Sequence, residues 1–118
     1  MKITFIIPRW PKDSFWDVIA FKFPLLSTSL LAGLTPANHQ LRIVDESLAE
    51  IDFDQDADLV AITAITPLAP RGYEVADEFR RRGRKVVIGG IHDSWLPDEA
   101  KAHCNSVAIG EADEVWAE

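Results

Sequence analysis

Short apolar runs that alternate with helical patterns are the feature that most constrains how this chain can fold. The runs cover Lys2–Pro8, His39–Val44, Leu59–Ile65, Lys85–Ile88 and Ser106–Ile109. The third run, LVAITAI, is nearly all apolar, as expected of a central parallel strand that is covered on both faces. Strands that alternate with helices form right-handed crossovers and a parallel sheet. We therefore predict a Rossmann-like (flavodoxin-like) three-layer α/β/α fold, with a five-stranded parallel sheet in the order 2-1-3-4-5.

Helical patterns follow the first, third, fourth and fifth runs, whereas an acidic connector, Ile51–Asp58, leads to the third run. From Pro24 onward, Leu26, Leu30 and Leu34 fall on one stripe flanked by Leu31, so we expect this stripe to be the apolar face of the helix. Further helices are predicted over Arg71–Arg82 with Gly83 as C-cap, over Pro97–His103, and from about Ala112 onward.

Composition and charge exclude several classes of protein. The chain has 118 residues, 47% of them hydrophobic, which suits one domain over residues 1–118. A formal net charge of -7 argues against nucleic acid as a partner. No apolar run approaches the roughly 20 residues that span a bilayer, and the N-terminus enters a strand pattern at once, so we expect no membrane partner and a cytoplasmic location. The single cysteine, Cys104, excludes an internal disulfide and is interpreted as a buried small residue.

The expected topology by itself predicts where a ligand would bind. In an open parallel sheet, ligands bind outside the carboxyl ends of the strands. The loop after the first strand, Arg9–Phe23, is long and aromatic, and its Trp10 and Trp16 suit a lid over a flat apolar ligand. The alternative is a loop that merely folds over the neighbouring helix.

Two further segments lie at the same predicted edge. Thr63 and Thr66 follow the third strand and can hold a polar ligand edge, although Thr66 can equally cap the turn. Gly89 and Gly90 end the fourth strand and permit close approach of backbone to a ligand, or else tight helix–strand packing. His92, on the same loop, could be a ligand, a hydrogen-bond donor or a local cap.

Several phosphate-binding motifs are absent. The sequence has no GxGxxG after the first strand and no GxxxxGK[ST], which argues against dinucleotide and P-loop binding. The Arg9–Phe23 loop contains no glycine, so a flavodoxin-type FMN loop is not favoured.

An ordered set of segments resembles the N-terminal cobalamin-binding-type domain of B12-dependent radical S-adenosylmethionine (SAM) proteins. The segments are Pro24–Pro36, Leu41–Glu46, Asp58–Thr66, Tyr73–Gly83, Val86–His92, Leu96–Ala100 and Gly110–Trp116. The resemblance implies a corrinoid against the carboxyl ends of the strands. Two family motifs are missing, because the loop after the first strand has no DxHxxG and the chain has no CxxxCxxC.

The resemblance implies a cobalamin-binding module of a radical SAM enzyme. Catalysis, as methyl transfer or a related radical reaction, would belong to a C-terminal radical SAM domain beyond this chain that holds the 4Fe-4S cluster and S-adenosylmethionine, and this chain alone would not be an enzyme. The expected cofactor-binding residues, none of them a metal ligand, are Trp10, Trp16, Thr63, Thr66, Gly89, Gly90 and His92. Two alternatives stay open: a vestigial structural domain of a radical SAM protein that positions a substrate, and a stand-alone flavodoxin-like enzyme.

Overall fold

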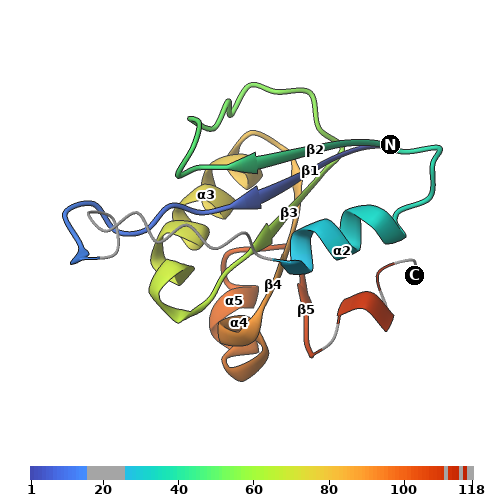
Figure 1. Ribbon diagram of the computed structural model, residues 1–118. Helices are drawn as coiled ribbons and strands as arrows, with labels where there is room; N and C mark the ends of the chain where they lie inside the picture. Colours follow the sequence, from blue (N-terminus) through green and yellow to red (C-terminus); the bar gives the residue numbers. More distant parts are fainter. Residues whose placement is uncertain (16–25, 111, 115, 117–118) are drawn as a thin grey trace.

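A parallel sheet forms the centre of the computed structural model, which describes residues 1–15, 26–110, 112–114 and 116 (Figure 1). The sheet has five strands in the order β2-β1-β3-β4-β5, and every neighbouring pair is parallel. Its strands are β1 (Lys2–Ile7), β2 (Gln40–Asp45), β3 (Leu59–Thr63), β4 (Lys85–Gly89) and β5 (Ser106–Ala108). The predicted α/β fold and strand order are therefore confirmed.

Helices connect the strands in the expected places. The α-helices are α2 (Leu26–Leu34), α3 (Ala69–Arg81), α4 (Ile91–Trp95) and α5 (Pro97–Lys101), and the 3₁₀ turns are η1 (Thr66–Leu68) and η2 (Ala112–Glu114). Helix α3 ends before Gly83, whose φ of 81° suits the residue that follows a helix. The loop expected after the fourth strand, which carries His92, contains the short helix α4.

The main apolar core lies between the sheet and α3. Phe79 of α3 is fully buried against Ile6 of β1 and Val60 of β3, and Cys104 belongs to the same cluster. Because each of these strands presents alternate residues to α3, the remaining residues face the opposite side of the sheet.

Helix α2 covers that opposite side (Figure 1). Leu31 and Ala32 of α2, together with Trp116, pack against Ile3 and Phe5 of β1. Figure 1 shows α2 and α3 on opposite faces of the sheet, which gives the three layers.

The face that α2 presents to the sheet differs from the predicted one. Leu30 and Leu34 are 52% and 47% exposed, whereas Thr28 is buried and Leu31 packs on the sheet. The side chain of Leu26 lies outside the described residues. The helix therefore uses positions spaced i, i+3 and i+4 from Thr28, so the predicted leucine stripe is wrong for the two leucines that can be placed.

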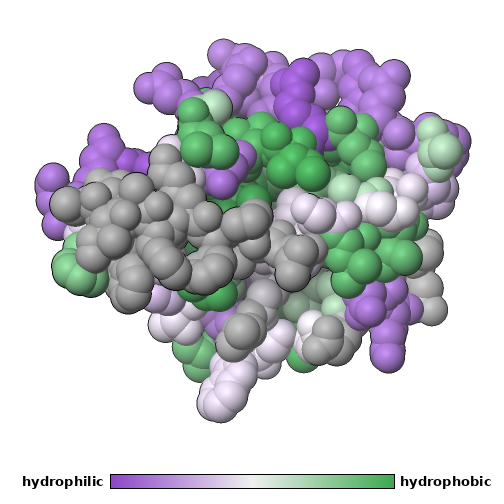
Figure 2. Space-filling view, in the orientation of Figure 1, coloured by the Kyte–Doolittle hydropathy of each residue, from purple (hydrophilic) through white to green (hydrophobic). Residues whose placement is uncertain are grey.

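The exposed leucines of α2 continue into an apolar surface over the edge strand β2. Figure 2 shows hydrophobic side chains gathered over β2 and beside α2, where Leu41 and Ile43 are also exposed.

Within the described part of the chain, no helix has the length and apolar character needed to cross a membrane.

Candidate functional site: an apolar pocket at the carboxyl ends of the strands

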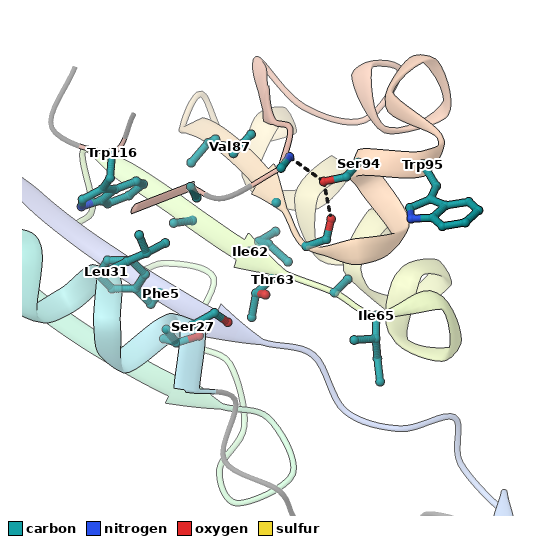
Figure 3. Close-up of a pocket in the computed structure, with 18 residues that line it drawn as sticks. Phe5, Ser27, Leu31, Ile62, Thr63, Ile65, Val87, Ser94, Trp95 and Trp116 are labelled. Carbon is teal, nitrogen blue, oxygen red and sulfur yellow. Dashed lines mark hydrogen bonds between the residues drawn. The ribbon is translucent and has the colours of Figure 1, made fainter. Parts of the chain in front are cut away.

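A pocket of about 420 Å³ opens beside the carboxyl ends of the central strands, on the face of the sheet that α2 covers (Figure 3). Phe5 of β1 and Thr63 of β3 line it from the sheet, and Leu31 lines it from α2. Trp95 of α4 and Trp116 line it from elements that follow β4 and β5. Its volume falls in the range of small-molecule sites, roughly 300–1,000 Å³.

The described residues that line this pocket carry no charged side chain. Its polar side chains are hydroxyls, such as that of Thr63, and indole N–H groups. The Trp116 N–H is already used, because it donates to Thr35 Oγ1 at 2.9 Å, while its ring lies 5.4 Å from that of Phe5. The pocket therefore suits an uncharged, largely apolar part of a ligand.

Gly90 gives one wall of the pocket a shape that other residues cannot form. Its φ is 132°, and a Cβ at this position would lie 2.3 Å from the carbonyl oxygen of Ala64. The amide of Ala64 also donates to the carbonyl oxygen of Gly89 at 3.1 Å. The segments that follow β3 and β4 are therefore in direct backbone contact beside the pocket, which requires glycine at position 90.

A polar cluster lies beside the pocket and outside its lining. His92 Nε2 lies 2.7 Å from Glu99 Oε2, and His92 Nδ1 lies 3.3 Å from Thr66 Oγ1. The hydroxyl of Tyr73 donates to the same carboxylate of Glu99 at 2.8 Å. Hydrogen bonds from His92 and Tyr73 lower the pKa of Glu99, so this carboxylate is ionised and accepts both. When His92 Nε2 donates to Glu99 and Nδ1 carries no proton, Nδ1 can accept from the Thr66 hydroxyl.

Asp93 is fully buried next to this cluster. Its Oδ1 lies 3.4 Å from the Tyr73 hydroxyl, whose proton goes to the nearer Glu99, and its Oδ2 has no hydrogen-bond partner among the described residues. Burial raises the pKa of Asp93 to about 6, against the smaller opposing effects of His92 and Tyr73. Among the described residues, no group of three or more His, Cys, Asp or Glu side chains is arranged to hold a metal ion.

The residues predicted from sequence divide into three groups. Thr63, Gly89 and Gly90 lie together in the lining of the pocket. Thr66 and His92 contact each other in the adjoining polar cluster. Trp10 is half-buried in the loop after β1 and is absent from the described lining, and Trp16 lies outside the described residues.

Several lining residues were missed by the sequence analysis. Phe5 and Leu31 were interpreted only as parts of a strand and a helix, although a pocket on one face of a sheet must use side chains from that face. Ser94 and Trp95 were missed because α4, only five residues long, shows no helical periodicity. Trp116 reaches the pocket through a contact with Phe5, far away in sequence, which no local pattern signals.

The chain is similar to known methyltransferases. It is 47% identical over 92 residues, 77% of this chain, to the bacteriochlorophyllide d C-8(2)-methyltransferase of Chlorobaculum tepidum. It is 46% identical over 120 residues, 99% of this chain, to the bacteriochlorophyllide d C-12(1)-methyltransferase of the same organism. An uncharacterized methyltransferase of Pyrococcus horikoshii is 26% identical over 131 residues.

The chain spans only part of these relatives. The matches cover 20%, 26% and 28% of their respective lengths. No protein-family model matches the chain, and no solved structure matches it.

These comparisons correct the family assignment made from sequence. The relatives are named as methyltransferases, and none of their names refers to cobalamin, a corrinoid, an iron–sulfur cluster or a radical reaction. The predicted cobalamin-binding module of a radical SAM enzyme is therefore withdrawn. We also withdraw the corrinoid and the 4Fe-4S cluster as cofactors, the radical SAM domain as a partner, and the two alternative functions.

Packing accounts for segments that suggested the withdrawn family. In Val86–His92, Gly90 is required by the close approach of the Ala64 carbonyl, and in Gly110–Trp116, Trp116 packs on Phe5. Ala100, the last residue of Leu96–Ala100, is fully buried. The order of these segments thus reflects the α/β architecture, which the structure has, and does not identify a cofactor.

Proposed function

We propose that this chain forms a ligand pocket of a methyltransferase whose substrate is a tetrapyrrole of the bacteriochlorophyllide type, and that the pocket receives the ring of that substrate. The observation that carries the proposal is the uncharged, apolar lining of the pocket at the carboxyl ends of the strands. The activity and the substrate are taken from the relatives that are 47% and 46% identical. The single-domain organisation and the cytoplasmic location remain predictions.

The chemistry of the lining favours the ring over charged ligands. A tetrapyrrole ring is flat and apolar, and Phe5, Trp95 and Trp116 offer aromatic surface for it. S-adenosylmethionine carries an ammonium, a carboxylate and a sulfonium, and the described lining has no charged side chain to pair with any of them. We therefore assign the pocket to the methyl acceptor and leave the methyl donor to another part of the full-length protein.

The residues singled out in the sequence take corresponding roles in this proposal. Thr63 supplies a hydroxyl at the end of β3, and the backbone of Gly89 and Gly90 forms part of the wall against which the ring would lie. The cluster of Thr66 and His92 forms a polar rim beside the pocket. Trp10 and Trp16, in the loop after β1, remain candidates for a cover over the exposed face of the ring.

Titration with bacteriochlorophyllide d tests this function. We expect binding to quench the tryptophan fluorescence of the chain and to shift the visible absorbance of the ligand in a saturable manner. Ser27 lines the pocket from α2 and Ser29 of the same helix does not, although both are exposed. Ser27→Leu places bulk in the pocket and should weaken binding about tenfold, the effect of roughly 1.4 kcal/mol, whereas Ser29→Leu should bind as the native chain does.

A parallel titration with S-adenosylmethionine distinguishes the two possible occupants. The proposal expects S-adenosylmethionine not to displace the bound tetrapyrrole. The opposite result is that the chain binds S-adenosylmethionine, loses this binding in Ser27→Leu, and does not bind bacteriochlorophyllide d. That result would show that the pocket has been assigned to the wrong ligand.

A further inference from the structure

The hydroxyl of Ser94 joins two loops that border the pocket. Its Oγ donates to the carbonyl oxygen of Gly90 at 2.9 Å and accepts from the amide of Gly110 at 2.9 Å (Figure 3). Gly90 follows β4, Gly110 follows β5, and all three residues line the pocket. This hydroxyl therefore bridges the backbones of the segments that follow β4 and β5.

The bridge lies where the sheet itself no longer holds the two segments together. The ladder between β4 and β5 ends with the pair Gly89 and Ala108. Beyond that pair, both Gly90 and Gly110 have positive φ values, 132° and 78°, so neither continues the extended conformation of its strand. Helix α4, which carries Ser94, has only five residues and little stability of its own.

The two hydrogen bonds occupy both the proton and one lone pair of the Ser94 hydroxyl. Its proton goes to Gly90, and one of its lone pairs accepts from Gly110, so it has no proton left to donate to a ligand. Trp95, the next residue in α4, also lines the pocket and is 82% exposed. The bond to Gly110 therefore fixes the position of the helix that carries this aromatic side chain.

We propose that Ser94 is a positioning residue: its hydroxyl sets the spacing between the loops after β4 and β5 and thereby shapes the pocket for its ligand. This inference rests on the proposed function for the identity of the ligand, a bacteriochlorophyllide-type ring. Ser94 acts through Gly90, Gly110 and the placement of Trp95, and it takes no part in chemistry.

The test compares Ser94→Ala with Ser94→Thr, which keeps a hydroxyl, and with Ser106→Ala as a control. Ser106 is an exposed serine at the start of β5 that is absent from the described lining. For each chain, the affinity for bacteriochlorophyllide d and the hydrogen exchange rate of the Gly110 amide without ligand are measured. Ser94→Ala should weaken binding about tenfold and speed exchange at Gly110 by at least about tenfold, because one neutral hydrogen bond contributes on this scale.

Restoring a hydroxyl at position 94 distinguishes a positioning role from a general loss of stability. Ser94→Thr should restore both the slow exchange at Gly110 and the native affinity, and Ser106→Ala should change neither. Slow exchange and native affinity in Ser94→Ala would overturn the inference, as would fast exchange with unchanged affinity.

The two measurements also distinguish this inference from the proposed function. If the native chain does not bind bacteriochlorophyllide d, the proposed function fails, whereas the exchange rate at Gly110 still decides whether Ser94 holds the two loops together. Unchanged exchange in Ser94→Ala would then overturn the inference as well.

Discussion

Replacing Gly90 by alanine should destabilise the protein more than the same change at Gly110 or Gly33. Two costs combine at this position. The backbone, with φ 132° and ψ 179°, lies in a region that is essentially restricted to glycine, at a cost of about 1–3 kcal/mol for other residues. In addition, the new Cβ would lie 2.3 Å from the carbonyl oxygen of Ala64, so the strand ends must move apart.

Gly110 and Gly33 serve as comparisons that separate the cost of backbone strain from the cost of the steric clash. Gly110 has a φ of 78°, but apart from its chain neighbours no atom of the described residues lies within 4 Å of the point that a Cβ would occupy, so alanine there should cost only the strain of about 1 kcal/mol. Gly33 lies in α2, where the backbone is helical and a Cβ would meet no atom of the described residues within 4 Å outside its own helix. Alanine at position 33 should therefore stabilise the protein by about 0.5–1 kcal/mol.

Urea unfolding, followed by tryptophan fluorescence, measures the three variants against the native chain. We expect a loss of about 3 kcal/mol or more for Gly90→Ala, about 1 kcal/mol for Gly110→Ala, and a small gain for Gly33→Ala. Equal stability of Gly90→Ala and Gly110→Ala would refute the reasoning, because it would mean that the contact between Gly90 and Ala64 costs nothing to disturb.

Two further predictions concern a buried carboxyl group and the orientation of a helix. Because burial raises the pKa of Asp93 to about 6 from 3.8, its contribution to stability is complete below pH 3.8 and is lost as the pH rises through 6. The loss is up to about 3 kcal/mol. In urea unfolding, the free energy of unfolding of Asp93→Asn relative to that of the native chain should therefore rise between pH 4 and pH 7. A difference in unfolding free energy that stays constant over this pH range would contradict the prediction. In α2, Leu31→Ala should cost about 1–2 kcal/mol and Leu30→Ala, at a site that is 52% exposed, less than about 0.5 kcal/mol; the reverse order in thermal melts would show that the helix packs through the predicted leucine stripe.

The strands and their order could be predicted because their signal is local and repeated. A run such as Leu59–Ile65 is apolar on both faces whatever surrounds it, and strands that alternate with helices leave few topologies. The same topology located Thr63, Gly89 and Gly90 at one edge of the sheet, where they line the pocket together.

The rest of the site depends on contacts that no local pattern encodes. The leucines of α2 could face the sheet in more than one rotation, and the packing of Leu31 on β1 selects one of them. Helix α4 was missed because five residues show no periodicity, and with it the bridge that Ser94 makes to Gly110. Trp116 joins the pocket through Phe5 of β1, a pairing set by the folded chain as a whole.

Hydrogen exchange with and without bacteriochlorophyllide d tests the central claim most directly, because it locates the bound ligand on the chain. If the pocket receives the ring, the ligand should slow amide exchange at the carboxyl ends of β3 and β4, around Thr63 and Gly90, and in α4 around Ser94. Exchange in α3, on the opposite face of the sheet, should stay the same. Protection confined to α3, or no protection at a ligand concentration that saturates the fluorescence change, would contradict the account.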